Sequence, residues 1–208
     1  MPTLLNRLSD VGFRSLYKRS IVGEFDGIPL VSLHSDPDAF VQGICSSLKL
    51  IKGKDQRRFD RITQQTQWLV DSPLAGGAYS GSYQHRIKAI RVDFEFDESV
   101  GDRDFHVAYF AKVIVHEATH GVIRDRGIDT TPENRIQVER ICRAEENRFI
   151  VGLRRSFPDL PEDLICQFDP DDWSGSWDEG AFRRFSRELC RGNQKSKKRE
   201  QDVHGNTH

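Results

Sequence analysis

Two histidines and a glutamate at helical spacing are the residues of this sequence best suited to chemistry. They lie in "VIVHEATHG", residues 113–121, as His116, Glu117 and His120. Residues four apart on an α-helix share one face and lie about 6 Å apart, so both imidazoles can direct a ring nitrogen to one metal ion. Glu117 is rotated by about 100° around the helix and can hold a water beside that ion. The pattern predicts half of a catalytic zinc site.

The alternative to a metal site is that His116 and His120 are two partly exposed histidines near a helix end, stabilised by the helix dipole and by Glu117. The context favours the metal site, because the motif follows an apolar run inside a predicted helix. The rest of that helix carries an apolar face that predicts burial in the core, formed by Val107, Phe110, Ile114, Val115 and Ala118.

A catalytic zinc ion usually has three protein ligands and one open position, so a third ligand is required. The next predicted helix offers three glutamates: Glu139, Glu145 and Glu146. Glu139 and Glu146 share a helix face, with Cys142 between them. Glu145 lies in a mostly apolar stripe, where a carboxylate would be buried unless it met a metal or a cation. Helical periodicity alone does not show which of the three glutamates is the third metal ligand.

The sequence HEATH, followed after an eighteen-residue gap by Glu139, resembles the gluzincin metallopeptidases, the thermolysin and zinc aminopeptidase type. In these enzymes two helices supply two histidines and one glutamate to zinc. A wider stretch, from about Asp93 to Leu153, also resembles small uncharacterised bacterial proteins assigned only as metallopeptidases. The resemblance implies Zn²⁺ as cofactor and an α+β, zincin-like fold, with a small, mostly antiparallel sheet packed on the active-site helix and on further helices. On spacing, Glu139 ranks first as third ligand, Glu146 second and Glu145 third.

Such a site predicts hydrolysis of peptide bonds in a peptide or protein substrate. Zinc lowers the pKa of water, and Glu117 would accept a proton and later pass it to the leaving nitrogen. Tyr79, Tyr83 or His85, in the segment before the predicted strand, could donate to the oxyanion, although tyrosines at such positions commonly serve packing. In zincins the strand before the metal helix aligns extended substrate, which residues 90–96 resemble.

A second function class is a zincin-like domain that binds metal or a partner without turnover and serves as a regulatory or interaction module. The two classes differ at Glu117, because a degenerate site would be expected to lose the catalytic carboxylate first. The presence of His116, Glu117 and His120 together therefore favours the enzyme.

Composition adds limits on partners. The 208 residues carry 31 basic and 32 acidic side chains, a formal net charge of −1, so no overall field favours nucleic acid or a membrane. No apolar segment approaches the roughly 18 residues that span a bilayer, which predicts a soluble, cytoplasmic protein. The four scattered cysteines predict reduced thiols used mainly in packing. Nothing in the sequence indicates an oligomeric state.

The elements around the site follow from hydrophobic periodicity and turn residues. We expect one domain over residues 1–192 and a disordered tail over 193–208. Strands are predicted within 22–33 and over 90–96, the latter with one buried face, and residues 72–84 are predicted as loop. Helices are predicted from Asp36 to Ile51, and over 54–70, 104–124, 130–158 and 181–189. Asp102 or Asp104 would cap the metal-binding helix, and Gly127 would end it.

Overall fold

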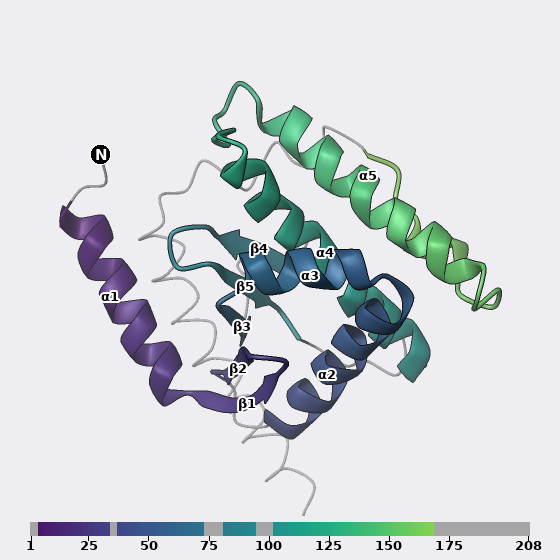
Figure 1. Cartoon of the computed structure of the whole chain (residues 1–208), viewed down its shortest axis with the longest axis horizontal. Helices are drawn as coiled ribbons and strands as arrows, with labels where there is room; N and C mark the ends of the chain where they lie inside the picture. Colours follow the sequence, from purple (N-terminus) through teal and green to yellow (C-terminus); the bar gives the residue numbers. More distant parts are fainter. Residues whose placement is uncertain (1–3, 34–36, 73–80, 95–101, 169–208) are drawn as a thin grey trace, which may run out of the picture.

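The computed structural model describes residues 4–33, 37–72, 81–94 and 102–168 (Figure 1). They form helices and one five-stranded sheet with the order β1-β2-β3-β5-β4, so the predicted α+β class is confirmed. The strands are β1 (Ile21–Phe25), β2 (Ile28–Ser32), β3 (Trp68–Asp71), β4 (Gly81–Gln84) and β5 (Ala89–Val92). The helices are α1 (Leu4–Arg19), α2 (Pro37–Lys54), α3 (Gln56–Gln65), α4 (Arg103–Asp125) and α5 (Arg135–Arg154), with a short 3₁₀ turn at Glu162–Leu164.

The sheet is mixed. Strands β2, β3 and β5 run parallel to one another, whereas β1 and β4 pair antiparallel with β2 and β5. The prediction of a mostly antiparallel sheet is therefore wrong at the centre of the sheet. Helices α2 and α3 supply the long connection that a parallel pair needs between β2 and β3. The predicted strands within 22–33 do form a hairpin, in which Asp26 and Gly27 have φ of 48° and 80°, as a tight two-residue turn requires.

Both faces of the central strands are covered. One face, including Leu30, Leu69 and Ile90, belongs to the main core, which also holds apolar side chains of α2, α3, α4 and α5. The other face, including Val70, packs with Tyr17 of α1, a helix absent from the predicted elements. The central strands are therefore buried as in parallel sheets rather than half-exposed.

Three local predictions fail for identifiable reasons. Residues 68–70 form strand β3, because α3 ends at Thr66 in extended backbone with φ −119° and ψ 113°. Residues 81–84, predicted as loop, form strand β4. The strand predicted over 90–96 is confirmed at its start as β5, whereas Asp93 and Phe94 lie beyond its end. All four residues of β5 are buried, so the alternation of polar and apolar residues did not indicate an exposed face.

The two helices that carry the candidate ligands largely match the prediction. The Asp102 side chain accepts a hydrogen bond from the Phe105 N–H and caps α4, and Gly127 follows its end with φ of 81°. Helix α5 begins later than predicted, because the Asn134 side chain accepts from the Thr131 N–H and donates to the Asp129 carbonyl, holding a turn. Helix α4 contacts the sheet on one side and α5 on the other (Figure 1).

Among the described residues, no helix combines the length and apolar character needed to cross a membrane. The predicted helix 181–189 and the predicted tail 193–208 lie outside the described residues.

Candidate metal centre

Six residues with metal-ligating or acid–base side chains lie at the contact between α4 and α5 or, for Glu117, on the adjoining side of α4 that faces the sheet. Helix α4 contributes His116, Glu117 and His120, and helix α5 contributes Glu139, Cys142 and Glu146. All but His120 are classed as buried, and the His120 side chain is 14% exposed. The alternative of two partly exposed histidines at a helix end does not fit His116, which is buried. A polar cluster of this kind inside a helix contact needs mutual pairing or a bound ion.

Glu139 faces both histidines through one oxygen. Its Oε2 atom lies 3.2 Å from Nε2 of His116 and 3.5 Å from Nε2 of His120. Two ligand atoms on a tetrahedral zinc ion, each about 2.0–2.1 Å from the metal, lie about 3.4 Å apart. Each of these two distances therefore matches the spacing of a pair of ligands around one ion, and of the three glutamates considered from the sequence, Glu139 is the one that faces both histidines.

The second oxygen of Glu139 supports the same assignment. Oε1 is buried and has no hydrogen-bond partner among the described residues, while Glu139 as a whole is 1% exposed. A buried carboxylate oxygen without a partner carries a desolvation penalty that a bound cation would remove. The donor set of two imidazoles and a carboxylate suits zinc.

Glu146 lies on the far side of the His116 ring. Its Oε2 atom is 2.6 Å from Nδ1 of His116, and its Oε1 atom accepts a hydrogen bond from Arg143 and lies 3.9 Å from Nζ of Lys112. A carboxylate at Nδ1 fixes the proton there and leaves Nε2 with its lone pair toward a metal. Glu146 is therefore placed to orient a ligand rather than to be one.

The two carboxylates change the acidity of the ring between them. Burial by itself lowers the pKa of His116, but the hydrogen bonds to Glu139 and Glu146 outweigh burial and raise it above its ordinary value. Burial raises the pKa of Glu139, and the hydrogen bonds with His116 and His120 more than offset this, so that its pKa falls below the usual range. Glu139 is thus held ionised, the form that binds metal.

Cys142 is the cluster member that the sequence reading assigned to packing. Its Sγ atom and nitrogen atoms of His116 and His120 all lie within 4.8 Å of one another, so it is a further potential donor. Burial first, and then the charges of neighbouring carboxylates, raise the pKa of its thiol. Spacing in the sequence already placed Cys142 between Glu139 and Glu146 on one helix face, and this spacing was the signal that could have identified it as a potential metal ligand.

Glu117 lies on the side of α4 that meets the sheet. Its carboxylate forms no hydrogen bond within the described part of the chain, and burial raises its pKa, partly offset by the charges of His116 and His120. A Cβ atom added to Gly81 of β4 would lie 2.8 Å from Oε1 of Glu117 and 2.7 Å from Cγ1 of Val113. Gly81 thus makes room for Glu117, a role that no local sequence pattern indicates.

The remaining predicted residues lie elsewhere. Glu145 pairs with arginines instead of the histidines, with Arg148 at 2.9 Å. Tyr83 donates its hydroxyl to the Gln65 carbonyl at 2.9 Å, so that hydroxyl is already committed, and burial raises its pKa to about 12. His85 is exposed in the turn after β4, and Tyr79 lies outside the described residues.

Comparisons with known proteins assign no family. No protein-family model matches the chain, and no curated protein or solved structure gives a significant match. The functional argument therefore depends on the geometry of this site.

Proposed function

We propose that this protein is a zinc-dependent metallopeptidase of the gluzincin type, built on a zincin-like fold. The observation that carries the proposal is the placement of one Glu139 oxygen opposite the Nε2 atoms of both His116 and His120, at 3.2 Å and 3.5 Å. Glu117, the residue after the first histidine, lies beside this group, and its carboxylate forms no hydrogen bond with other described residues. These are the three ligands and the acid–base group that the HExxH pattern requires.

Each side chain has a distinct part in the proposed reaction. His116, His120 and Glu139 would hold zinc, which when bound supplies Lewis acidity toward a carbonyl oxygen and acidifies water. Glu117 takes a proton from the attacking water and returns it to the leaving nitrogen. Glu146 keeps the proton of His116 on Nδ1. Tyr83 is not assigned as an oxyanion donor, because its hydroxyl already donates a hydrogen bond to the Gln65 carbonyl.

Strand β4 is the element best placed to align a substrate. It ends the sheet in the described part of the chain, and α4 packs on it where Gly81 meets Glu117. An extended peptide could add to such an edge through main-chain hydrogen bonds. Of the residues 90–96 that were expected to have this role, 90–92 belong to β5, which pairs with β3 on one edge and β4 on the other, so the proposal gives the role to β4 instead.

The test combines metal content with cleavage. Wild-type protein, Glu117→Gln and a matched control, Glu162→Gln, whose side chain is 86% exposed, would be purified without chelator and incubated with a peptide library. We expect about one zinc ion per chain in all three proteins, cleavage by wild type and the control, and at least about a hundredfold loss in Glu117→Gln. Failure to bind added zinc would contradict the proposal outright.

A second candidate is a non-catalytic zincin-like domain that binds metal for a regulatory or structural purpose. One observation favours it: Cys142 lies close enough to the histidines to be a fourth donor. Structural zinc sites are closed by four protein ligands, whereas catalytic sites keep one position open. Bound zinc without any Glu117-dependent cleavage would select this candidate over the enzyme.

A further inference from the structure

A cavity of about 230 Å³ lies between α3, α4 and α5, on a different side of α4 from Glu117. Its lining includes neither of the site histidines and no carboxylate of the candidate metal centre. Four arginines contribute to it: Arg58 and Arg61 from α3, Arg126 directly after α4 and Arg148 from α5. We call it the arginine cavity.

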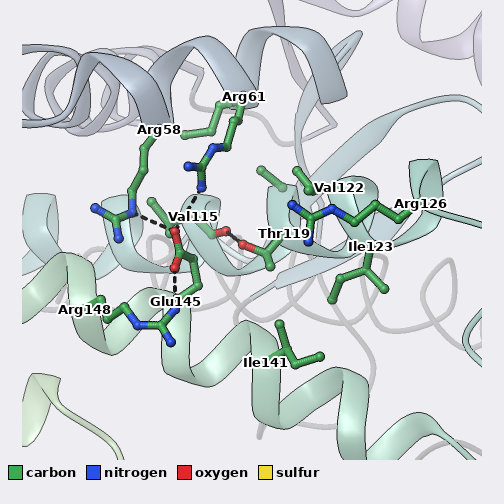
Figure 2. A pocket seen from close by; sticks show the side chains of 12 residues that line it. Arg58, Arg61, Val115, Thr119, Val122, Ile123, Arg126, Ile141, Glu145 and Arg148 are labelled. Carbon is green, nitrogen blue, oxygen red and sulfur yellow. Dashed lines mark hydrogen bonds and ion pairs between the residues drawn. The ribbon is translucent and has the colours of Figure 1, made fainter. Parts of the chain in front are cut away.

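A single carboxylate organises three of these arginines. Glu145 accepts from Nε of Arg58 at 3.2 Å and from Arg61 at 3.1 Å through Oε1, and from Arg148 at 2.9 Å through Oε2 (Figure 2). Burial tends to raise the pKa of Glu145, but the arginines hold it below its usual range. Each guanidinium has five N–H donors, so one carboxylate leaves most of them available. Arg58 also pairs with Asp55, the residue that caps α3, so two carboxylates hold the three guanidinium groups in place without neutralising all of them.

Arg126 adds a fourth guanidinium group, at an exposed position. Its guanidinium extends toward Thr119 and Val122 in Figure 2, and it forms no ion pair within the described residues. Four guanidinium groups thus line a cavity that contains one acidic side chain. Uncompensated positive charge around a concave surface attracts anions, and guanidinium groups bind carboxylate and phosphate oxygens in pairs.

The rest of the lining is largely aliphatic. Val115 and Val122 of α4 and Ile141 of α5 are among the apolar side chains that line it. Small-ligand sites commonly combine an apolar surface with a few polar groups that fix orientation. The volume suits a small molecule rather than a folded partner.

We propose that the arginine cavity binds a small organic anion, with a carboxylate or phosphate head held by the arginines and an apolar body against the aliphatic lining. The site is independent of the candidate metal centre. The hydrogen-bonding network around Glu145 pre-orders three of the four cations, which reduces the ordering cost of binding.

The test uses titration calorimetry with the full chain and four probes: hexanoate, hexyl phosphate, acetate and hexanamide. We expect saturable binding of hexanoate or hexyl phosphate, with acetate weaker for lack of an apolar body and hexanamide weaker for lack of charge. Which of the two charged probes binds more tightly identifies the head group. Binding should also weaken as salt is raised.

Single substitutions test whether the anion binds in the arginine cavity. Arg126→Gln and Arg61→Gln should each weaken the better probe by roughly tenfold, the effect of one charge-assisted hydrogen bond. Arg57→Gln, an exposed position on α3 outside the cavity, is the matched control and should bind as wild type does. Circular dichroism would show that the variants remain folded. Equal binding by all variants, equal binding of hexanamide, or no saturable binding by wild type would overturn the proposal, and none of these outcomes depends on zinc or on peptide cleavage.

Discussion

The Nδ1 atom of His116 lies 2.6 Å from Oε2 of Glu146, inside the contact between α4 and α5. The opposite nitrogen of the same ring lies 3.2 Å from Glu139. One imidazole is therefore held between two carboxylates of the next helix, one at each nitrogen. The two glutamates have different consequences for a metal, because only the Nε2 side also faces His120.

Glu146→Gln should weaken zinc binding by about 10- to 100-fold, the usual cost of losing a carboxylate that orients a histidine ligand. Glu139→Gln should weaken it further, because it replaces a charged ligand. Zinc affinity measured by competition with a chelating dye compares the two, with Glu162→Gln as an exposed control. An equal effect of the two substitutions would contradict the different roles assigned to Glu139 and Glu146.

Cobalt spectroscopy should show an oxygen and nitrogen donor set. Thiolate ligation to Co²⁺ produces an intense near-ultraviolet charge-transfer band, which imidazole and carboxylate ligands do not. We expect no such band in wild type and nearly unchanged Co²⁺ affinity in Cys142→Ser. One Glu139 oxygen lies 3.2 Å and 3.5 Å from the Nε2 atoms of the two histidines, as pairs of ligands do, whereas burial raises the pKa of the Cys142 thiol and disfavours its thiolate. A band that disappears in Cys142→Ser would identify a closed site and favour the non-catalytic candidate.

Gly81→Ala should impair catalysis more than metal binding. The added Cβ would lie 2.8 Å from Oε1 of Glu117 and 2.7 Å from Cγ1 of Val113, so the Glu117 carboxylate must move. Misplacing an acid–base group commonly reduces turnover by about tenfold or more. Gly152→Ala, on α5 with nothing within 4 Å of its added Cβ, is the control and should leave cleavage unchanged. Unchanged turnover in Gly81→Ala would show that the contact does not position Glu117.

The buried Asp71 carboxyl should make the free energy of unfolding fall as pH rises. Burial raises its pKa from 3.8 to about 7, partly offset by the hydrogen bond from Ser32. Between these values the folded protein keeps a proton that the unfolded chain has lost, so stability decreases by up to about 1.4 kcal/mol per pH unit. The stabilising contribution of protonated Asp71 to the free energy of unfolding is complete below about pH 4 and is lost as the pH approaches 7.

Asp71→Asn removes this titration and should unfold in urea with a weaker dependence on pH than wild type. The variant should gain stability relative to wild type as the pH is raised from 5 to 8. Asp60→Asn, at an exposed position of α3, controls for the loss of a carboxylate. Parallel stability curves for Asp71→Asn and wild type would contradict the expectation.

The part of the site that sequence could predict is the part that depends on local periodicity. His116, Glu117 and His120 lie on one helix, where spacing alone determines the face each residue occupies. To choose Glu139 over Glu145, one must know which face of α5 is turned toward α4. The hydrophobic patterns of the two helices, taken separately, do not specify that orientation. Spacing and resemblance placed Glu139 first, and the geometry of the α4–α5 contact agrees.

The errors in the fold have a common cause. The two central strands Trp68–Asp71 and Ala89–Val92 are covered on both faces. Their residues are all buried, without the alternation of buried and exposed residues expected of a half-exposed strand. Arg91, a polar residue within the strand that was predicted to have one buried face, is only 8% exposed and donates a hydrogen bond to Ser72. Pairing with neighbouring strands, rather than local sequence preference, determines that these segments are buried strands. The space that Gly81 provides for Glu117 likewise depends on residues far apart in the sequence.

The short connection between α4 and α5 also affects the order of folding. The contacts of His116 with Glu139 and Glu146 span only 23 and 30 positions, so a helical hairpin can form them with little loss of loop entropy. Glu117 reaches its place against Gly81 only when α4 docks on the sheet. We therefore expect zinc to protect α4 and α5 amides in pulse-labelling hydrogen exchange before the sheet is protected. Metal capture would then precede catalytic competence during folding.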